Sequence, residues 1–141
     1  MRNQVRTGLI RGALVLAGAL PYLAFALGGG PTWLARWFRF QCHGRIDRTL
    51  ALGGQYFPVC SRCLGIYTGL ALASILVIPK VSAPARRMWI VGAALAMVLE
   101  VYVQDASGHA PIHVLRLVTG LLLAWPVALT LVAAGSSAKE E

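Results

Sequence analysis

Charged residues are scarce in this sequence. Only 13% of its 141 residues are charged, whereas 57% are hydrophobic and the mean hydropathy is +0.67. A soluble domain usually carries about 25% charged residues. The deficit argues against a soluble globular domain and indicates an integral membrane protein.

Acidic residues are the scarcest charged class. The chain has 5 acidic and 13 basic residues, which gives a formal net charge of +8. A basic chain can indicate nucleic-acid binding. Here, however, the basic residues flank apolar runs, as membrane-anchoring charges do. We therefore expect the partner to be a lipid bilayer and not nucleic acid.

Several catalytic motifs are absent from the sequence. It contains no GxSxG, Walker A, HExxH or GxGxxG pattern, so serine nucleophiles and phosphate-cradling loops lack support. There are only three cysteines, an odd number that cannot pair completely within one chain. This count argues against a disulfide framework and favours a metal site, or one redox pair with a free thiol.

Four apolar runs are present, at residues 12–30, 63–79, 88–104 and 114–135. A membrane-spanning helix needs about 20 residues, with about 17 to 25 tolerated. Because backbone groups in lipid must pair within their own segment, helices are expected. We predict one all-α membrane domain over residues 1–141, a four-helix bundle with helices at about 9–30, 63–79, 88–104 and 114–135. A long, partly irregular loop, 31–62, rich in Cys and Arg, joins the first two.

The first run has a second interpretation. Arg2, Arg6 and Arg11 precede it, and Ala-Phe-Ala at 24–26 resembles a signal-peptidase site. Its apolar stretch is longer than the signal core of about 7 to 15 residues, which favours a retained helix.

Glycine spacing predicts close helix packing. Gly65 and Gly69 form a GxxxG pattern, as do Gly8 and Gly12. Such spacing lets helices approach closely in lipid, although glycine is also common in membrane helices generally. Separately, the aromatic and arginine residues of 31–40 suit a segment in the headgroup region.

Loop placement predicts which regions meet. With four spans, the first and third loops lie on one face, so the cysteine loop and residues 100–116 share a compartment. The terminal side carries seven basic residues, Arg2, Arg6, Arg11, Lys80, Arg86, Arg87 and Lys139, and the other side carries six, Arg36, Arg39, Arg45, Arg48, Arg62 and Arg116. The positive-inside rule then favours cytoplasmic termini.

The main chemical signal is Cys42-His43 followed by Cys60 and Cys63 in the pattern CSRC. Cysteine and neutral histidine are the usual zinc ligands. We predict a Cys/His metal site at one membrane face, with zinc as the ion and the three cysteines as thiolate ligands. The candidates for the fourth ligand are His43, His113 and His109. Three thiolates favour a closed structural site, since catalytic zinc keeps an open position.

Two other functions stay open. Cys60 and Cys63 lie at a predicted helix start, where the helix dipole and Arg62 favour a thiolate, so a thiol–disulfide or quinone-linked oxidoreductase is one alternative. No thioredoxin-like βαβ pattern surrounds them, and buried cysteines are often inert. The other alternative is a non-catalytic lipid-binding or accessory subunit, in which arginines bind anionic lipid headgroups or another membrane protein.

Polar residues also occur within the apolar runs. An ionisable group at membrane depth, such as Glu100, indicates a functional site and should have a partner. Arg116 is the expected partner by depth, either functionally or as a structural link between two helices. Tyr67 lies one turn beyond Cys63 and so shares its face, where it either closes the site or belongs to an interfacial aromatic belt.

Residues 42–69, CHGRIDRTLALGGQYFPVCSRCLGIYTG, resemble the signature of domain-of-unknown-function family 2085, small predicted prokaryotic membrane proteins. That pattern is roughly CHxxPxRSF, then GG, then PVCxRCxGIYxG. The matching positions are Cys42, His43, Arg48, Gly53, Gly54, Pro58, Val59, Cys60, Arg62, Cys63, Gly65, Ile66, Tyr67 and Gly69, with Glu100, Gln104, Arg116, Thr119 and Gly120 in a second block. Ile46, Thr49, Leu50 and His113 depart from the usual Pro, Ser, Phe and Asn.

The resemblance implies a multi-pass protein of the prokaryotic cytoplasmic (inner) membrane. It also implies a shared polar site, which here comprises the cysteines with Arg48, Arg62, Tyr67, Glu100, Gln104 and Arg116. It implies no activity, and whether the protein is an enzyme stays open.

Overall fold

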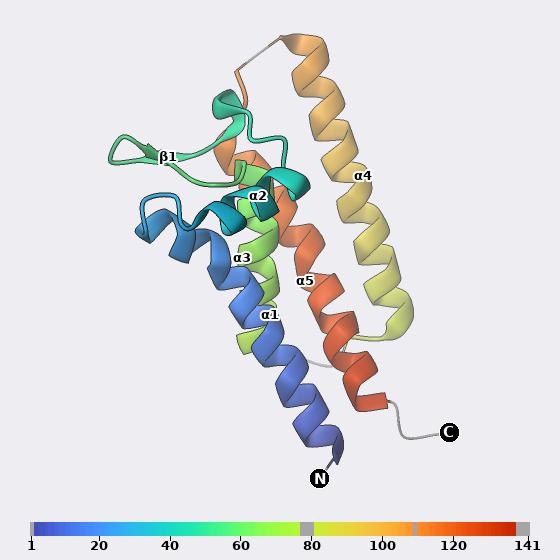
Figure 1. Ribbon diagram of the computed structural model, residues 1–141. Coiled ribbons are helices and arrows are strands. Elements are labelled where there is room, and N and C mark those ends of the chain that lie inside the picture. Colours follow the sequence, from blue (N-terminus) through green and yellow to red (C-terminus); the bar gives the residue numbers. More distant parts are fainter. Residues whose placement is uncertain (1, 77–80, 109, 138–141) are drawn as a thin grey trace.

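A computed structural model describes residues 2–76, 81–108 and 110–137. Within these ranges the chain forms five α-helices, one 3-10 turn and one short hairpin (Figure 1). The elements are α1 (Arg2–Ala26), α2 (Thr32–Gln41), η1 (Ile46–Arg48), β1 (Ala51–Leu52), β2 (Gln55–Tyr56), α3 (Ser61–Ile75), α4 (Ala83–Ser107) and α5 (His113–Ser137).

The predicted all-α class is confirmed, but a four-helix membrane bundle is not. Three described helices are long and apolar enough to cross a membrane, over Gln4–Ala26, Ala83–Gln104 and His113–Ser136. The remaining predicted span, 63–79, corresponds to α3, which has 15 residues. At 1.5 Å per residue it is about 22 Å long, against about 30 Å of bilayer hydrocarbon. Its predicted end at residue 79 lies outside the described residues.

The segment predicted as a loop, 31–62, contains regular structure. Helix α2 buries Leu34 and Phe38 and exposes its other aromatic residues and its arginines, a two-sided pattern that suits a helix lying in the membrane interface. The strands β1 and β2 follow, joined at Gly53 and Gly54, whose positive φ angles permit the tight turn.

The helices are arranged so that the site residues lie at one end of the molecule. In Figure 1, α2, the hairpin, the end of α4 and the start of α5 lie toward one end of the molecule, whereas α1 begins and α5 ends at the opposite end. The regions predicted to meet do so, because Arg62 pairs with Glu100 and Ser61 is hydrogen-bonded to His113. Helix α3 packs against both α1 and α5, and α5 packs in addition against α1 and α4.

Glycines bring α3 against α5. A Cβ atom added to Gly65 would lie 2.1 Å from the carbonyl oxygen of Leu117, and one added to Gly120 of α5 would lie 2.3 Å from that of Arg62. The GxxxG pattern that begins at Gly65 is therefore a helix-packing motif, as predicted. In contrast, added Cβ atoms on Gly8 and Gly12 meet no described atom within 4 Å.

Apolar side chains cover the outside of the three helices that are long and apolar enough to cross a membrane. Leu16, Leu95 and Val98 are 68%, 64% and 62% exposed, as expected of helices whose solvent is lipid. A buried hydrophobic cluster lies instead at the end near the cysteines, where Phe38 and Val59 are each 1% exposed.

Candidate metal centre

Cys42 is held over the start of α3 by the packing of α2. It directly follows α2, and its backbone N–H donates to the carbonyl oxygen of Phe38 at 2.8 Å. The Phe38 ring in turn packs edge-on against Tyr67 of α3, with centroids 6.1 Å apart. Tyr67 also donates a hydrogen bond to Gln41 at the end of α2. These contacts bury Cys42 between the two helices.

Cys60 and Cys63 come from the beginning of α3. Cys60 is the N-cap residue and Cys63 lies in the first turn. The Sγ atoms of Cys42, Cys60 and Cys63 all lie within 4.8 Å of one another, and all three cysteines are free. In a tetrahedral zinc site with Zn–S bonds of about 2.3 Å, sulfurs are about 3.8 Å apart. Small side-chain shifts therefore suffice to bring three thiolates around one ion.

The surroundings of Cys42 favour its thiolate. Hydrogen bonds from the thiols of Cys60 and Cys63 are the main cause that lowers the pKa of Cys42 far below that of an ordinary cysteine, and burial opposes them. The backbone N–H of Cys60 adds a hydrogen bond to the Cys42 sulfur at 3.2 Å. The hydrogen bonds of the Cys63 thiol to Cys42 and Cys60 in turn raise the pKa of Cys63. Because an ionised sulfur is the form that binds metal, an ion at this site would have to displace the Cys63 proton.

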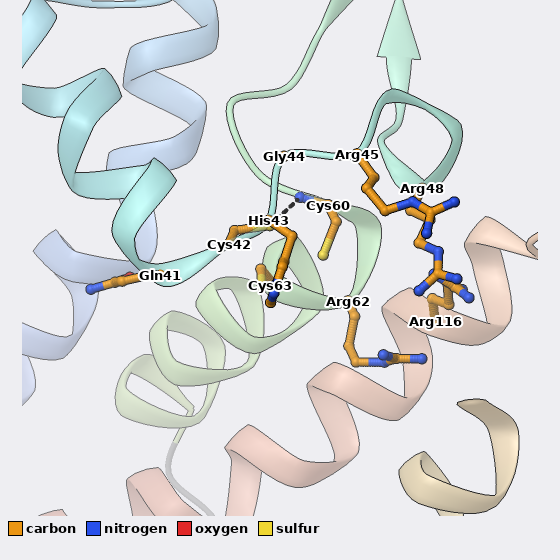
Figure 2. Close-up of a pocket in the computed structure, with 10 residues that line it drawn as sticks. All are labelled: Gln41, Cys42, His43, Gly44, Arg45, Arg48, Cys60, Arg62, Cys63 and Arg116. Atoms are coloured by element: carbon orange, nitrogen blue, oxygen red, sulfur yellow. Dashed lines mark hydrogen bonds between the residues drawn. The ribbon is translucent and has the colours of Figure 1, made fainter. Parts of the chain in front are cut away.

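A cavity of about 330 Å³ opens beside the sulfurs. Figure 2 shows the cysteines on one side of it and arginine side chains on the other. No carboxylate is among its described lining residues, which are Gln41, Cys42, His43, Gly44, Arg45, Arg48, Cys60, Arg62, Cys63 and Arg116.

Two of the lining arginines pair with one exposed carboxylate. Arg45 donates to Asp47 through Nε and Nη2, each at 3.1 Å, and the Arg48 Nε atom is 3.8 Å from the same carboxylate. The hydrogen bonds from Arg45 are the main cause that lowers the pKa of Asp47. The segment Arg45–Arg48 thus presents two guanidinium groups oriented by a single acid.

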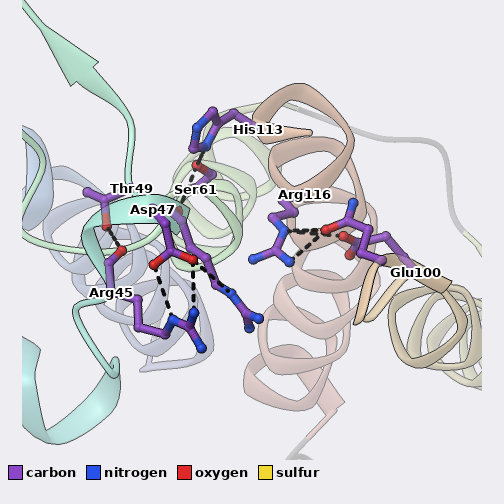
Figure 3. A network of polar contacts seen from close by, with 9 residues as sticks. Arg45, Asp47, Thr49, Ser61, Glu100, His113 and Arg116 are labelled. Atoms are coloured by element: carbon purple, nitrogen blue, oxygen red, sulfur yellow. Dashed lines mark hydrogen bonds and ion pairs between the residues drawn. The ribbon is translucent and has the colours of Figure 1, made fainter. Parts of the chain in front are cut away.

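The other two lining arginines share Glu100 inside the helix bundle. Arg62 donates to the Glu100 carboxylate, and the Nε atom of Arg116 is 3.4 Å from it. Arg116 also donates to the Gln104 amide oxygen at 2.8 and 2.6 Å, and Figure 3 shows Arg116 facing Glu100. Glu100, Gln104 and Arg116 are buried. This polar cluster links α3, α4 and α5, and its two cations share one acid.

Ser61 connects α3 to α5 and to the loop. Its Oγ lies 3.1 Å from the carbonyl oxygen of Arg48 and 2.7 Å from Nδ1 of His113 (Figure 3). A hydroxyl has one proton to donate. If Ser61 donates to the carbonyl, which can only accept, then Nδ1 of His113 carries a proton and donates to Ser61.

The predicted ligands are only partly brought together. Cys42, Cys60 and Cys63 form one group, and His43 lines the adjacent cavity but does not belong to that group. His113 is hydrogen-bonded to Ser61, and His109 lies outside the described residues. Of the predicted polar residues, Arg48, Arg62 and Arg116 line the cavity. Glu100 and Gln104 contact Arg116 but do not line the cavity. Tyr67 contacts α2.

The roles of Ser61, Arg45 and Asp47 were not predicted from the sequence. The run Arg45-Ile-Asp-Arg48 carried a signal, because an acid flanked by two arginines commonly pairs with them. Ser61 carried none, since its partners lie far away in the sequence.

Comparison with known proteins identifies the family. Residues 42–130 match the family described as "Predicted membrane protein (DUF2085)". The chain belongs to this family. The DUF2085 match includes all three cysteines and the Glu100–Arg116 region, and it confirms the resemblance drawn from the sequence.

A relative of this DUF2085 chain is an "Uncharacterized protein" from Methanothermobacter thermautotrophicus. It is 59% identical over 32 residues, which cover 23% of this chain and 29% of the relative. No solved structure matches the chain.

Proposed function

We propose that this DUF2085 chain is a zinc-binding membrane protein in which Cys42, Cys60 and Cys63 hold one ion at a membrane face. The observation that carries the proposal is the grouping of three free Sγ atoms within 4.8 Å of one another. Soft thiolate ligands favour zinc over calcium or magnesium. His43, which lines the cavity next to the sulfurs, is the preferred protein residue for a fourth ligand.

The metal would act as a clamp on the polar end of the protein. Cys42 ends the α2 region and Cys60 begins α3, with a sequence separation of 18 residues. A metal bound to both closes this loop and holds it against α3, so that metal binding contributes folding free energy. The clamp would keep Arg45 and Arg48, which lie within the loop, beside the sulfurs.

Membrane location forms part of the proposal. The protein would lie in the prokaryotic cytoplasmic membrane with its termini in the cytoplasm, because the terminal side carries the larger number of basic residues. The metal site would then lie on the opposite side of that membrane.

The test is metal content. The chain is purified in detergent without added metal, and metals are counted per chain by mass spectrometry. We expect about one zinc ion, loss of it in Cys60→Ser, and normal content in Ser136→Ala, a control at the opposite end of the bundle. His43→Ala should weaken zinc retention against a chelator.

One result would replace the proposal with another function. If the protein is metal-free and Cys60 and Cys63 form a disulfide that reductant opens and oxidant restores, the oxidoreductase alternative is favoured. Alkylation of the cysteines before and after reduction, followed by peptide mass spectrometry, identifies that state. A metal-free protein whose cysteines never pair contradicts both functions.

A further inference from the structure

We propose that the cavity beside the cysteines binds a phosphate group. Four guanidinium groups border this cavity, and they come from three separate parts of the chain. Arg45 and Arg48 come from the loop, Arg62 from α3 and Arg116 from α5. Guanidinium groups match phosphate oxygens in geometry and charge. This inference goes beyond the zinc proposal and does not depend on it.

The charge around the cavity favours an anion. Asp47 pairs with Arg45 and Arg48, and Glu100 pairs with Arg62 and Arg116. None of the described residues that line the cavity is itself a carboxylate, so the four guanidinium groups border it without an acid among them. A phosphate group carries one to two negative charges near neutral pH, so it suits this lining.

A buried hydrogen-bond donor of Arg62 points to the same class of ligand. The Arg62 Nε atom is buried and has no hydrogen-bond partner among the described residues, although the residue lines the cavity. A buried donor without a partner is costly, and an oxyanion that accepts from it removes that cost. Glu100 and Gln104 hold the neighbouring Arg116 in place, so this guanidinium group is positioned before any ligand arrives.

The size of the cavity and its position limit the ligand. A volume of about 330 Å³ lies at the small end of ligand sites, which span about 300–1,000 Å³. It therefore suits a phosphate group and not an entire lipid. Because α2 exposes Trp33, Trp37 and Phe40 beside it, the cavity lies where lipid headgroups occur. The phosphate can thus come from a free anion or from a phospholipid headgroup.

The test compares two double variants of the full-length protein. In phosphatidylcholine nanodiscs at low salt, inorganic phosphate is titrated and binding is measured by calorimetry. We expect the pair Arg45→Gln and Arg48→Gln to weaken binding at least tenfold, since charge-assisted hydrogen bonds are lost. The pair Arg36→Gln and Arg39→Gln, which removes the same charge from the exposed face of α2, should change binding less than twofold.

A second arm identifies the source of the phosphate. Nanodiscs that contain phosphatidic acid are used, and the lipid retained on detergent extraction is counted by mass spectrometry. The wild type could retain phosphatidic acid without binding free phosphate. If the Arg45→Gln and Arg48→Gln pair then loses the lipid, the ligand is a lipid headgroup and the proposal is supported. If neither phosphate form binds, or if both double variants reduce binding equally, the proposal is wrong.

Two controls distinguish a loss of phosphate binding from a loss of folding or of zinc. Circular dichroism checks that each variant is folded. If the Arg45→Gln and Arg48→Gln pair is unfolded, Arg48→Lys replaces it, because lysine keeps the charge but lacks the paired donors of arginine. Unchanged phosphate binding in Arg48→Lys would also contradict the proposal. Zinc is counted in the same samples. If the purified wild type contains no zinc but binds phosphate, only the zinc proposal is contradicted. If it contains zinc but binds no phosphate in either form, only the phosphate proposal is contradicted.

Discussion

Replacing Gly65 with alanine tests the helix contact on which the site is built. The added Cβ would lie 2.1 Å from the carbonyl oxygen of Leu117, whereas carbon atoms normally approach to about 3.5 Å. Helices α3 and α5 would have to move apart by on the order of 1 Å, and such overpacking costs about 1–3 kcal/mol. Helix propensity returns up to about 1 kcal/mol, so we expect a net loss of about 1–2 kcal/mol.

The matched control is Gly92→Ala in α4, where an added Cβ meets no described atom within 4 Å. It should leave stability unchanged or raise it by up to about 1 kcal/mol. Both variants are unfolded with sodium dodecyl sulfate in mixed micelles and followed by circular dichroism. Because Cys60 and Cys63 lie at the start of the same helix as Gly65, the destabilised variant should also retain less zinc. Equal stability of the two variants would refute the close α3–α5 contact.

Other changes give further tests. Glu100→Gln leaves Arg62 and Arg116 without their shared carboxylate, so we expect a loss of about 3 kcal/mol in the same unfolding assay, since breaking a buried ion pair is strongly destabilising; an unchanged midpoint would argue against the pair. Ser61→Ala removes the link to His113 and should cost about 1 kcal/mol, visible as a small shift of the same transition. Zinc should be released as the pH falls, because protons compete for the three thiolates. Dialysis at stepped pH followed by metal analysis measures this release, and zinc content that stays constant as the pH falls would contradict thiolate ligation. A green fluorescent protein fused to the C-terminus should fluoresce if that end is cytoplasmic, and a dark but stable fusion would place it outside.

Hydropathy predicted most of the helices but not all of their limits. The long apolar runs became α1, α4 and α5 because such runs can satisfy their backbone only as helices in lipid. Helix α3 ends at Ile75, earlier than its apolar run, since hydropathy measures the length of an apolar segment and not where the backbone leaves the helix. Helix α2 was predicted as part of a loop, although Leu34 and Phe38 are spaced one turn apart.

Residue type and spacing predicted the centre of the candidate site better than its periphery. The pattern CSRC with an upstream cysteine predicted the grouping of Cys42, Cys60 and Cys63. The partnership of Glu100 with Arg116 was also anticipated from their similar depth, and it is present. The pairing of Glu100 with Arg62 was missed, because the two residues are 38 positions apart and only helix rotation brings them together.

The sequence by itself determined the class of protein and the chemistry available at one of its ends. Scarce charge and long apolar runs require a lipid environment, and thiols close to imidazoles and guanidinium groups limit what can be bound there. Only the tertiary structure decided that four arginines border one cavity and that His113 contacts Ser61. The physical reason is that local sequence sets the period and polarity of a helix, whereas its rotation depends on contacts with distant segments. In this protein the close approach of Gly65 and Gly120 to the facing helix sets that rotation and brings the site together.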